Sequence, residues 1–185
     1  MIPDFIEVYD NALSSSQCKE IIDWTEGHNL IRGGTSIGYS PLKKDCFEVP
    51  NTNLTDNHFV NDYISKSLFE HTQKYRDKYW ECHKPMNEWQ PKAQYNIQKY
   101  YPGQGYHHKH CENGDKASSH RVLVWMFYLN TVTDDGGTYF TTYDRITDAV
   151  EGRLVIWPAY WTHTHCGVVS NTQIKYIITG WFVFR

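Results

Sequence analysis

The sequence predicts a mainly β domain, an antiparallel sandwich or barrel with N-terminal α-helices on one face. Helical periodicity is confined to the N-terminal half of the chain, whereas strand and turn patterns follow one another from residue 93 to residue 184. Strands do not alternate with helices in that second part. Strands that succeed one another without crossover helices pair antiparallel, which favours a sandwich or a barrel over a parallel sheet.

The first expected elements are a short strand and a helix. Residues 5–9 alternate between apolar and polar side chains, as in a half-buried strand. Ser14 and Gln17 have the spacing of a capping box, which predicts a helix that begins there and continues to about Glu26. The inner face of this helix is expected to carry Cys18, Ile21, Ile22 and Thr25.

A loop and a longer helix follow. Residues 29–50 contain several glycines and Pro41 without sustained periodicity, so we expect a loop or a short irregular strand pair that could cover a substrate groove. Either Thr55 or Asp56 is expected to cap a second helix, which packs across the back of the sheet. Its apolar positions have amphipathic spacing and comprise Phe59, Val60, Tyr63, Ile64, Leu68, Tyr75 and Tyr79.

The remaining elements are strands. Residues 81–91 predict a polar connection, because they include two prolines. After it, Ala93, Tyr95 and Ile97 alternate with polar neighbours. Residues 121–129 are almost continuously apolar and predict a central strand. Further strands are expected at residues 139–140, 153–157 and 175–184, with a tight turn at residues 134–137.

The composition bounds the organisation and the partners. A chain of 185 residues fits a single domain, with helical support over residues 1–90 and the core over residues 91–185. The net charge is −3 and basic residues are scattered, which disfavours nucleic acid and anionic membranes as partners. The five cysteines lack Cys-x-x-Cys spacing, as in reduced proteins. No signal peptide or membrane segment is recognised, so a cytoplasmic location is expected.

Two histidine-containing stretches predict an iron site. His110 and Glu112 are one residue apart, so in an extended strand both side chains leave the same face. Either His163 or His165 could complete a set of two histidines and one carboxylate. Such a set suits non-haem Fe(II), because three protein ligands on one face leave positions open for a chelating co-substrate and oxygen. A lone His-x-Glu triplet is close to chance, so its position after the Pro102-Gly103 turn carries weight.

Residues 95–184 contain several short motifs in a fixed order. They are Tyr101-Pro102-Gly103, His110 and Glu112 with the loop 113–115, Arg121 opening a strand that ends Tyr128-Leu129-Asn130, Gly136-Gly137 before Phe140, Gly152-Arg153-Leu154, and the closing stretch 175–182. In these motifs and their order, residues 95–184 resemble the catalytic core of the 2-oxoglutarate and Fe(II)-dependent oxygenases, specifically the prolyl 4-hydroxylase-like branch.

The resemblance implies a double-stranded β-helix, also called a jelly roll, and a dioxygenase activity. The implied reaction hydroxylates an unactivated C–H bond, most closely that of a peptidyl proline, and converts 2-oxoglutarate to succinate and CO2. Fe(II), 2-oxoglutarate and O2 are the implied cofactor and co-substrates, and ascorbate is implied as a reductant. A peptide is therefore the expected partner, with a small molecule as the alternative; the oligomeric state stays open.

The resemblance also assigns the site residues. His110, Glu112 and His165 are the implied metal ligands, because Lys175 lies ten residues after His165, where the family has a basic residue. The reverse assignment of His163 remains an alternative. Lys175 and Tyr128 would bind the distal carboxylate of 2-oxoglutarate, and Tyr101 would donate to the metal-binding end. An exposed strand lysine and ordinary core tyrosines are the alternatives.

The chain departs from the family pattern near the expected iron. Glu112 stands where the family usually has aspartate, which adds one methylene. Tyr106 is four residues before His110 instead of three, so His107 could take its place. Val124 stands where a threonine commonly contacts 2-oxoglutarate. We interpret His107 and His108 as solvent-facing turn histidines, with a substrate contact as the alternative.

Two other functions are compatible with these motifs. The first keeps the chemistry but acts on a free amino acid or a small metabolite. The second is a non-catalytic jelly-roll binding protein that holds a metal ion without turnover. The presence of Lys175 argues against the second, because a buried lysine without a partner is costly and a bound anion would compensate it.

Overall fold

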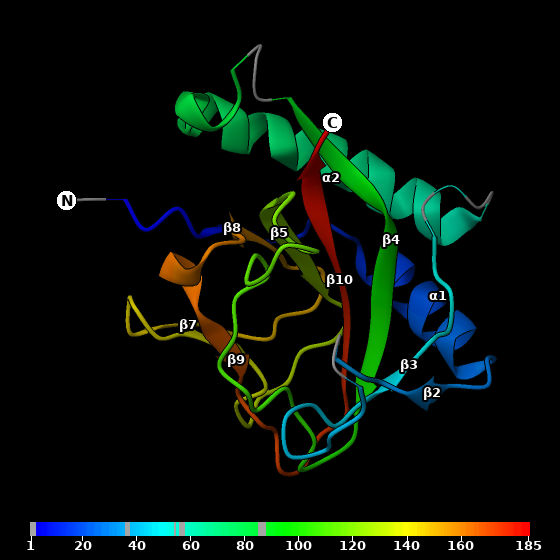
Figure 1. Ribbon diagram of the computed structural model, residues 1–185. Helices are drawn as coiled ribbons and strands as arrows, with labels where there is room; N and C mark the ends of the chain where they lie inside the picture. The colour runs from blue at the N-terminus through cyan, green and yellow to red at the C-terminus, as the bar shows by residue number, and fades with distance from the viewer. Residues whose placement is uncertain (1–2, 36–37, 54, 56–57, 85–87) are drawn as a thin grey trace.

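The computed structural model describes residues 3–35, 38–53, 55, 58–84 and 88–185. Its strands form two antiparallel sheets (Figure 1). In spatial order, the large sheet contains β1 (Glu7–Tyr9), β8 (Leu154–Pro158), β5 (Arg121–Tyr128), β10 (Lys175–Phe184), β4 (Trp89–Tyr100), β3 (Phe47–Glu48) and β2 (Ile31–Arg32). The small sheet contains β7 (Arg145–Thr147), β6 (Thr138–Phe140) and β9 (His165–Gly167). The predicted mainly β architecture is confirmed.

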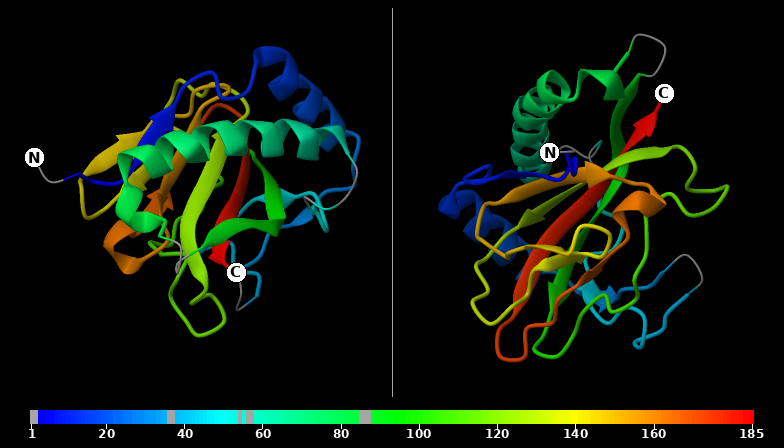
Figure 2. Two further views of the ribbon diagram at one scale, coloured as in Figure 1. Left: turned by 90° about the horizontal axis from the view of Figure 1, so that it is seen from above. Right: turned by 90° about the vertical axis from the view of Figure 1, so that its left-hand side faces the viewer.

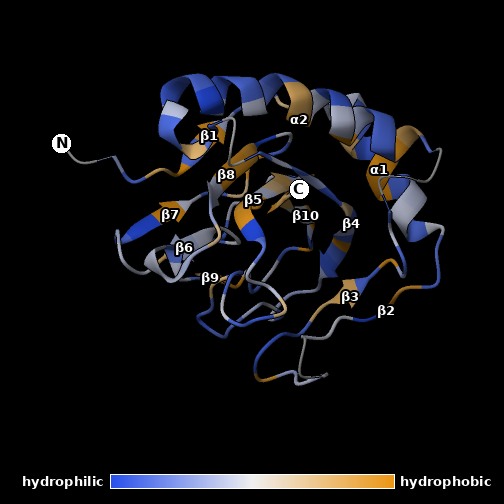
Figure 3. Ribbon diagram, turned by 45° about the horizontal axis from the view of Figure 1, so that its top comes forward, coloured by the Kyte–Doolittle hydropathy of each residue, from blue (hydrophilic) through white to orange (hydrophobic). Residues whose placement is uncertain are grey.

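Two α-helices cover one face of the large sheet (Figure 2). The first, α1 (Ser15–Glu26), begins with the predicted capping box between Ser14 and Gln17. The second, α2 (Phe59–Lys78), runs across the strands as predicted and buries Val60, Ile64, Leu68 and Tyr75. Much of α2 is hydrophilic (Figure 3), and its charged residues are exposed except for the half-buried Arg76. No helix in the described part of the chain has the length and apolar character needed to cross a membrane.

The N-cap prediction for α2 was wrong. His58 caps this helix, because its imidazole accepts a hydrogen bond from the backbone N–H of Val60. Thr55 lies before the helix and bonds to Asn53 instead. Asp56, the other predicted cap, lies outside the described residues. The helix therefore starts later than a scan for Ser, Thr, Asp and Asn indicates.

Strand β5 shows how the sheet separates two apolar cores. Its alternate residues Val124 and Met126 belong to a cluster between the two sheets. Trp125 and Phe127 belong to a second cluster beneath the helices. Successive side chains of a strand point to opposite faces, so both faces of β5 are buried and its sequence is continuously apolar. The cluster between the sheets forms the wall of the pocket described below.

The structure extends one predicted strand and adds further ones. Strand β4 begins at Trp89, within the stretch predicted as a polar connection. Its long partner β10 makes this possible, since Phe184 pairs with Trp89 and the register shifts near Pro91. Strands β7 and β9, which the sequence did not predict, pair with β6 to complete the small sheet. Two short 3₁₀ turns, η1 (Trp80–Cys82) and η2 (Trp161–His163), complete the regular structure of the described residues.

A glycine in the middle of β10 allows the large sheet to pack beneath the helices. A Cβ built on Gly180 would lie 2.2 Å from Cζ2 of Trp125. We therefore expect Gly180→Ala to lower the free energy of unfolding by about 1–3 kcal/mol, because the indole must move. Gly27→Ala is the control, since Gly27 has an ordinary helical φ of −75°. Denaturant unfolding of both variants measures the difference; equal stabilities would contradict this packing argument.

Candidate metal centre and co-substrate pocket

Main-chain pairing brings the two histidine-containing stretches together. His110 and His165 form an antiparallel bridge, in which the His110 N–H lies 3.0 Å from the His165 carbonyl and the reverse bond is 2.9 Å. The N–H of Glu112 donates to the carbonyl of Ala159, just after β8, over 2.9 Å. These main-chain hydrogen bonds attach the loop after β4 both to the start of β9 in the small sheet and to the end of β8 in the large sheet.

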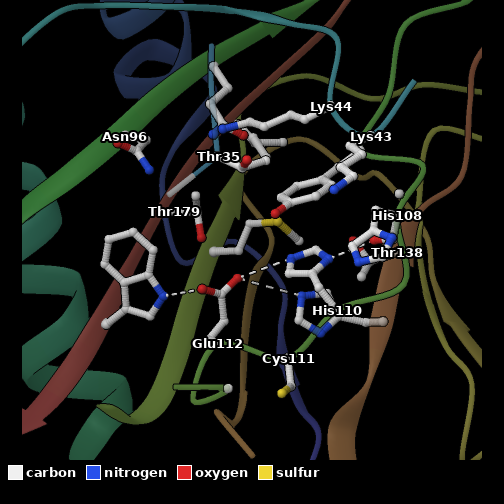
Figure 4. Close-up of a pocket in the computed structure, with 18 of the residues that line it drawn as sticks. Thr35, Lys43, Lys44, Asn96, His108, His110, Cys111, Glu112, Thr138 and Thr179 are labelled. Atoms are coloured by element: carbon white, nitrogen blue, oxygen red, sulfur yellow. Dashed lines mark hydrogen bonds and ion pairs between the residues drawn. The ribbon is translucent and has the colours of Figure 1, made fainter. Parts of the chain in front are cut away.

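His110, Glu112 and His165 form a group of side chains that could hold a metal ion. One ligand atom from each lies within 4.8 Å of the others. Oε1 of Glu112 is 3.2 Å from Nε2 of His110 and 3.9 Å from Nε2 of His165. Figure 4 shows Glu112 and His110 directed toward each other, whereas the sulfur of Cys111 is directed away. Cys111 is therefore not a ligand candidate, because successive side chains of an extended segment leave opposite faces.

Backbone carbonyls set the tautomers of both histidines. Nδ1 of His110 is 2.8 Å from the carbonyl of His108, and Nδ1 of His165 is 2.9 Å from the carbonyl of His163. Because a carbonyl only accepts, each Nδ1 carries a proton, so Nε2 of each ring is the nitrogen directed at the carboxylate and available to a metal ion. Three electron-rich atoms facing one another fit a cation between them. Such outer hydrogen bonds are typical of metal-binding histidines.

Electrostatics keep the group in its ligand form. Burial opposes ionisation of Glu112, but the hydrogen bond and charge of His110 and the charges of His165 and Arg121 outweigh it and lower its pKa to about 2. Burial and the neighbouring His110 lower the pKa of His165 to about 4. Near neutral pH the carboxylate is thus ionised and His165 is neutral, as metal binding requires.

The group opens into a cavity of about 500 Å³ that also contains Lys175 and Tyr128. Lys175 is 5 % exposed. Its ammonium donates to the carbonyl of Gly136 over 2.8 Å and lies 3.5 Å from that of Val168. Burial lowers the pKa of Lys175 to about 8. A buried ammonium whose described hydrogen-bond partners are neutral carbonyls favours a bound anion.

The hydroxyl of Tyr128 lies in the same cavity, beside β6 and β7. It is 2.8 Å from Oγ1 of Thr138 and 3.2 Å from the carbonyl of Thr147, to which it donates. Burial raises the pKa of Tyr128 to about 12, so its hydroxyl keeps its proton. The cavity therefore contains a possible metal group and, among its other lining residues, a cation and a hydroxyl that could bind a carboxylate.

Comparisons with known proteins agree with this arrangement. The family model described as the 2OG-Fe(II) oxygenase superfamily matches residues 95–183, which include the whole metal group and Lys175. The match thus identifies residues 95–183, just under half of this chain, with the 2-oxoglutarate and Fe(II)-dependent oxygenases. Fe(II), 2-oxoglutarate and O2 are accordingly its cofactor and co-substrates, and its activity is that of a dioxygenase. A search of curated protein sequences finds no match.

Solved structures show that the oxygenase has the fold of prolyl hydroxylases, a double-stranded β-helix. A viral collagen prolyl hydroxylase from Paramecium bursaria Chlorella virus-1, in complex with 2OG, superposes with a TM-score of 0.73 at 20 % identity over 96 % of this chain and 95 % of that chain. A Pseudomonas putida prolyl-4-hydroxylase gives 0.73 at 15 % identity, over 97 % and 93 %.

A third solved structure is that of a peptide complex. The prolyl hydroxylase from Trichoplax adhaerens, bound to a peptide fragment of the hypoxia inducible factor oxygen degradation domain, superposes with a TM-score of 0.75. It is 15 % identical, over 97 % of this chain and 84 % of that chain.

The structure separates the two distal histidines of the oxygenase. His165 begins β9 and faces Glu112, whereas His163 ends the 3₁₀ turn η2 and is buried elsewhere. Nε2 of His163 is 2.7 Å from the carbonyl of Asp4, and Nδ1 is 2.9 Å from Oγ1 of Thr162. The two histidines do not leave the same face of a strand, although they are two residues apart, because the turn interrupts the extended backbone. The geometry favours His165 as the ligand.

The position expected for Tyr101 was wrong. Asn96, Gln98 and Tyr100 on alternate positions of β4 line the cavity. Alternation then directs Tyr101 to the opposite face, where it is 40 % exposed and its ring packs against Phe47. Tyr101 therefore does not reach the metal end. Of these two neighbouring tyrosines, Tyr100 lines the cavity, and its hydroxyl donates to Oε1 of Gln98 over 2.7 Å.

The expected displacement of Tyr106 was also wrong. Tyr106 lines the cavity, and its ring stacks on that of His110 with centroids 3.8 Å apart. His107 is exposed and does not replace it. His108 is exposed at the cavity rim, where its backbone carbonyl orients His110. Main-chain pairing with Gly167 and Lys44 fixes the position of Tyr106, so the extra residue between Tyr106 and His110 does not move its ring out of the cavity.

Sequence reasoning missed several residues of the cavity. Trp181 and Arg121 both bond to Glu112, and Lys44 lines the far wall, where it forms an ion pair with Glu48. Alternation from Lys175 along β10 puts Ile177, Thr179 and Trp181 on the same face, and all four residues line the cavity. This period of two could have indicated Trp181 from the sequence. Lys44 and Thr35 come from the loop that was expected to cover a substrate groove, so part of this loop lines the cavity.

Proposed function

We propose that His110, Glu112 and His165 hold Fe(II) and that Lys175 and Tyr128 bind the distal carboxylate of 2-oxoglutarate. One observation carries this proposal: the His-His-Glu group and the buried ammonium of Lys175 line the same cavity. When bound, Fe(II) would supply the activation of O2 that protein side chains cannot provide. The donor set suits this ion, because three ligands on one face leave positions free for a chelating co-substrate.

The residues of the chain would orient the co-substrate and exclude water. Lys175 and Tyr128 would fix one end of 2-oxoglutarate by an ion pair and a hydrogen bond, which leaves its keto acid end toward the three ligands. Packing around His165 is dense on the core side, since the rings of Phe140 and Trp157 lie 5.7 and 5.1 Å from its own. These rings keep that side of the centre free of solvent.

We propose a peptidyl proline as the substrate, with release of succinate and CO2. The support is the likeness in fold to prolyl hydroxylases, one of which was solved with a peptide bound. The cavity extends beyond Glu112 to Thr179 and Asn96, so it has room on the side away from Lys175 for a substrate chain. A free amino acid or a small metabolite is the competing substrate class, because fold alone does not select between them.

Anaerobic titration followed by turnover tests the proposal. Fe(II) and 2-oxoglutarate are added without oxygen, and the visible charge-transfer band of the chelate is recorded. Oxygen is then admitted with ascorbate, and succinate is measured with proline-containing peptides and, separately, with free proline. Peptides that gain one oxygen atom support the proposed substrate; gain only by the free amino acid would refute it. Absence of both the band and succinate would refute the iron and co-substrate assignments.

The affinity for 2-oxoglutarate should fall as pH rises above about 8. The pKa of Lys175 is lowered to about 8 in the free protein, so its positive charge is present below that pH and lost above it. Binding of the dianion requires the charge, and each further pH unit should therefore weaken binding by up to about tenfold. Anaerobic titrations from pH 7 to 10 measure this. Lys175→Arg should remove the dependence, because arginine stays charged; an unchanged profile would exclude Lys175 as its source.

A further inference from the structure

The two carboxylate oxygens of Glu112 have different surroundings. Oε1 faces the imidazoles of His110 and His165, at 3.2 and 3.9 Å. Oε2 accepts a hydrogen bond from Nη1 of Arg121 at 2.9 Å and one from Nε1 of Trp181 at 2.8 Å. Figure 4 shows the carboxylate between an indole on one side and the imidazoles on the other. One oxygen is thus directed at the metal group and the other is held by two donors.

The large sheet holds these two donors beside each other. Arg121 begins β5, and Trp181 of β10 pairs with Val124 of the same strand. The guanidinium carbon of Arg121 lies 3.9 Å from the centre of the Trp181 ring, so the two side chains are stacked. Nη1 of Arg121 also donates to the backbone carbonyl of Glu112, over 3.2 Å. Both donors therefore occupy positions set by strand pairing and by each other.

Because Glu112 is largely buried, the hydrogen bonds from Arg121 and Trp181 determine how its carboxylate is oriented. The side chain of Glu112 is 15 % exposed, so water has little access to replace a lost donor. Glutamate has one more rotatable bond than aspartate and loses more side-chain freedom when it is held in one conformation. Without Arg121 and Trp181, its carboxylate could rotate and offer both oxygens to a bound ion.

We propose that Arg121 and Trp181 are positioning residues that restrict Glu112 to a single metal-directed oxygen. This inference rests on the proposed role of Glu112 as an iron ligand. Two donors on Oε2 leave Oε1 for the ion, so the carboxylate takes up one coordination position and the others stay open for co-substrate and oxygen. The two donors also compensate the extra length of glutamate, because they hold its terminal carboxylate in place.

Co(II) binding in the absence of oxygen and 2-oxoglutarate tests the positioning role without turnover. We expect Trp181→Phe, which keeps an aromatic ring but removes the indole N–H, and Arg121→Met each to weaken Co(II) binding by about tenfold. The visible spectrum of bound Co(II) should also change, since it responds to the number of coordinated oxygens. Trp89→Phe is the matched control, because Trp89 is buried and its N–H donates over 2.7 Å to the carbonyl of Cys82, away from the site.

The Glu112→Asp background separates positioning from general destabilisation. An aspartate is one methylene shorter and cannot keep its carboxylate both at the metal group and against the two donors. Trp181→Phe should therefore change Co(II) affinity by less than about threefold in Glu112→Asp, compared with about tenfold in the parent. Equal fold-changes in the two backgrounds would overturn the positioning role, as would a Trp181→Phe variant with the affinity and spectrum of the parent.

The same titration distinguishes the failure of this inference from that of the proposed function. If the parent binds Co(II), His165→Ala abolishes binding and Trp181→Phe leaves it unchanged, the metal centre stands and the positioning role is refuted. If the parent binds no Co(II), the proposed metal centre is refuted and the positioning role with it. Reduced affinity and an altered spectrum in both Trp181→Phe and Arg121→Met, with Trp89→Phe unchanged, support the inference.

Discussion

A Lys175→Met variant should lose at least about 100-fold in affinity for 2-oxoglutarate, because removal of one partner from a buried ion pair costs about 3–5 kcal/mol. In the structure the ammonium is held by the carbonyls of Gly136 and Val168 and lines the same cavity as the metal group. Methionine fills a similar volume without the charge. Anaerobic titration with 2-oxoglutarate in the presence of Fe(II) measures the loss, while binding of Fe(II) alone should change little.

A second buried lysine provides the control. Lys99 is also 5 % exposed, but it lies on the opposite face of β4 and pairs with Glu26 at 2.8 Å. Lys99→Met should therefore lower stability without changing 2-oxoglutarate affinity. If Lys175→Met weakened Fe(II) and 2-oxoglutarate binding equally, or if Lys99→Met matched its effect on 2-oxoglutarate, Lys175 would be a structural residue instead of a co-substrate residue.

His165→Ala should abolish tight binding of Fe(II), whereas His163→Ala should retain it. His165 presents Nε2 to Glu112, and its loss leaves two protein ligands, which costs more than the 10–100-fold typical of an outer partner. His163 bonds through Nε2 to the carbonyl of Asp4 and through Nδ1 to Thr162, so both of its nitrogens are engaged outside the group. Anaerobic titration of each variant with Fe(II) or Co(II) measures the difference.

The His163→Ala variant has an expected effect of its own. It removes a buried ring that connects η2 to the N-terminal segment, so its melting temperature should fall even though its metal affinity does not. His163→Asn keeps a polar side chain and should therefore recover part of the melting temperature lost in His163→Ala. Loss of metal binding in His163→Ala at temperatures where it is folded, with His165→Ala still binding, would reverse the assignment.

The sequence predicted the elements whose residues carry strong local patterns. The capping box of α1, the amphipathic face of α2 and the buried strands β5 and β10 all appear close to the expected residues. In each case the pattern is a direct consequence of burial on one face of a helix or both faces of a strand. The order of short motifs was sufficient to recognise the family resemblance, and the match of the family model to residues 95–183 confirms it.

Predictions that required the path of an irregular segment were wrong. Tyr101 lies one residue beyond Tyr100, and strand alternation places the two on opposite faces. A 3₁₀ turn ending at His163 removes this histidine from the face of His165. The loop before His110 returns Tyr106 to the site despite its unusual spacing. Local patterns are uninformative in such places, because main-chain pairing with distant residues determines the direction of the side chains.

The sequence alone was enough to predict the fold class, the family resemblance and the residue types of the candidate metal group, since these depend on periodicity and on residue types at short spacings. The tertiary structure was needed to show that His165, and not His163, faces Glu112. It was also needed to show that Tyr100, and not Tyr101, lines the cavity. It also showed that Arg121 and Trp181 hold the second oxygen of Glu112. Local sequence patterns do not reveal these contacts, because they join segments that are far apart in the chain and the register of the sheets determines which residues meet.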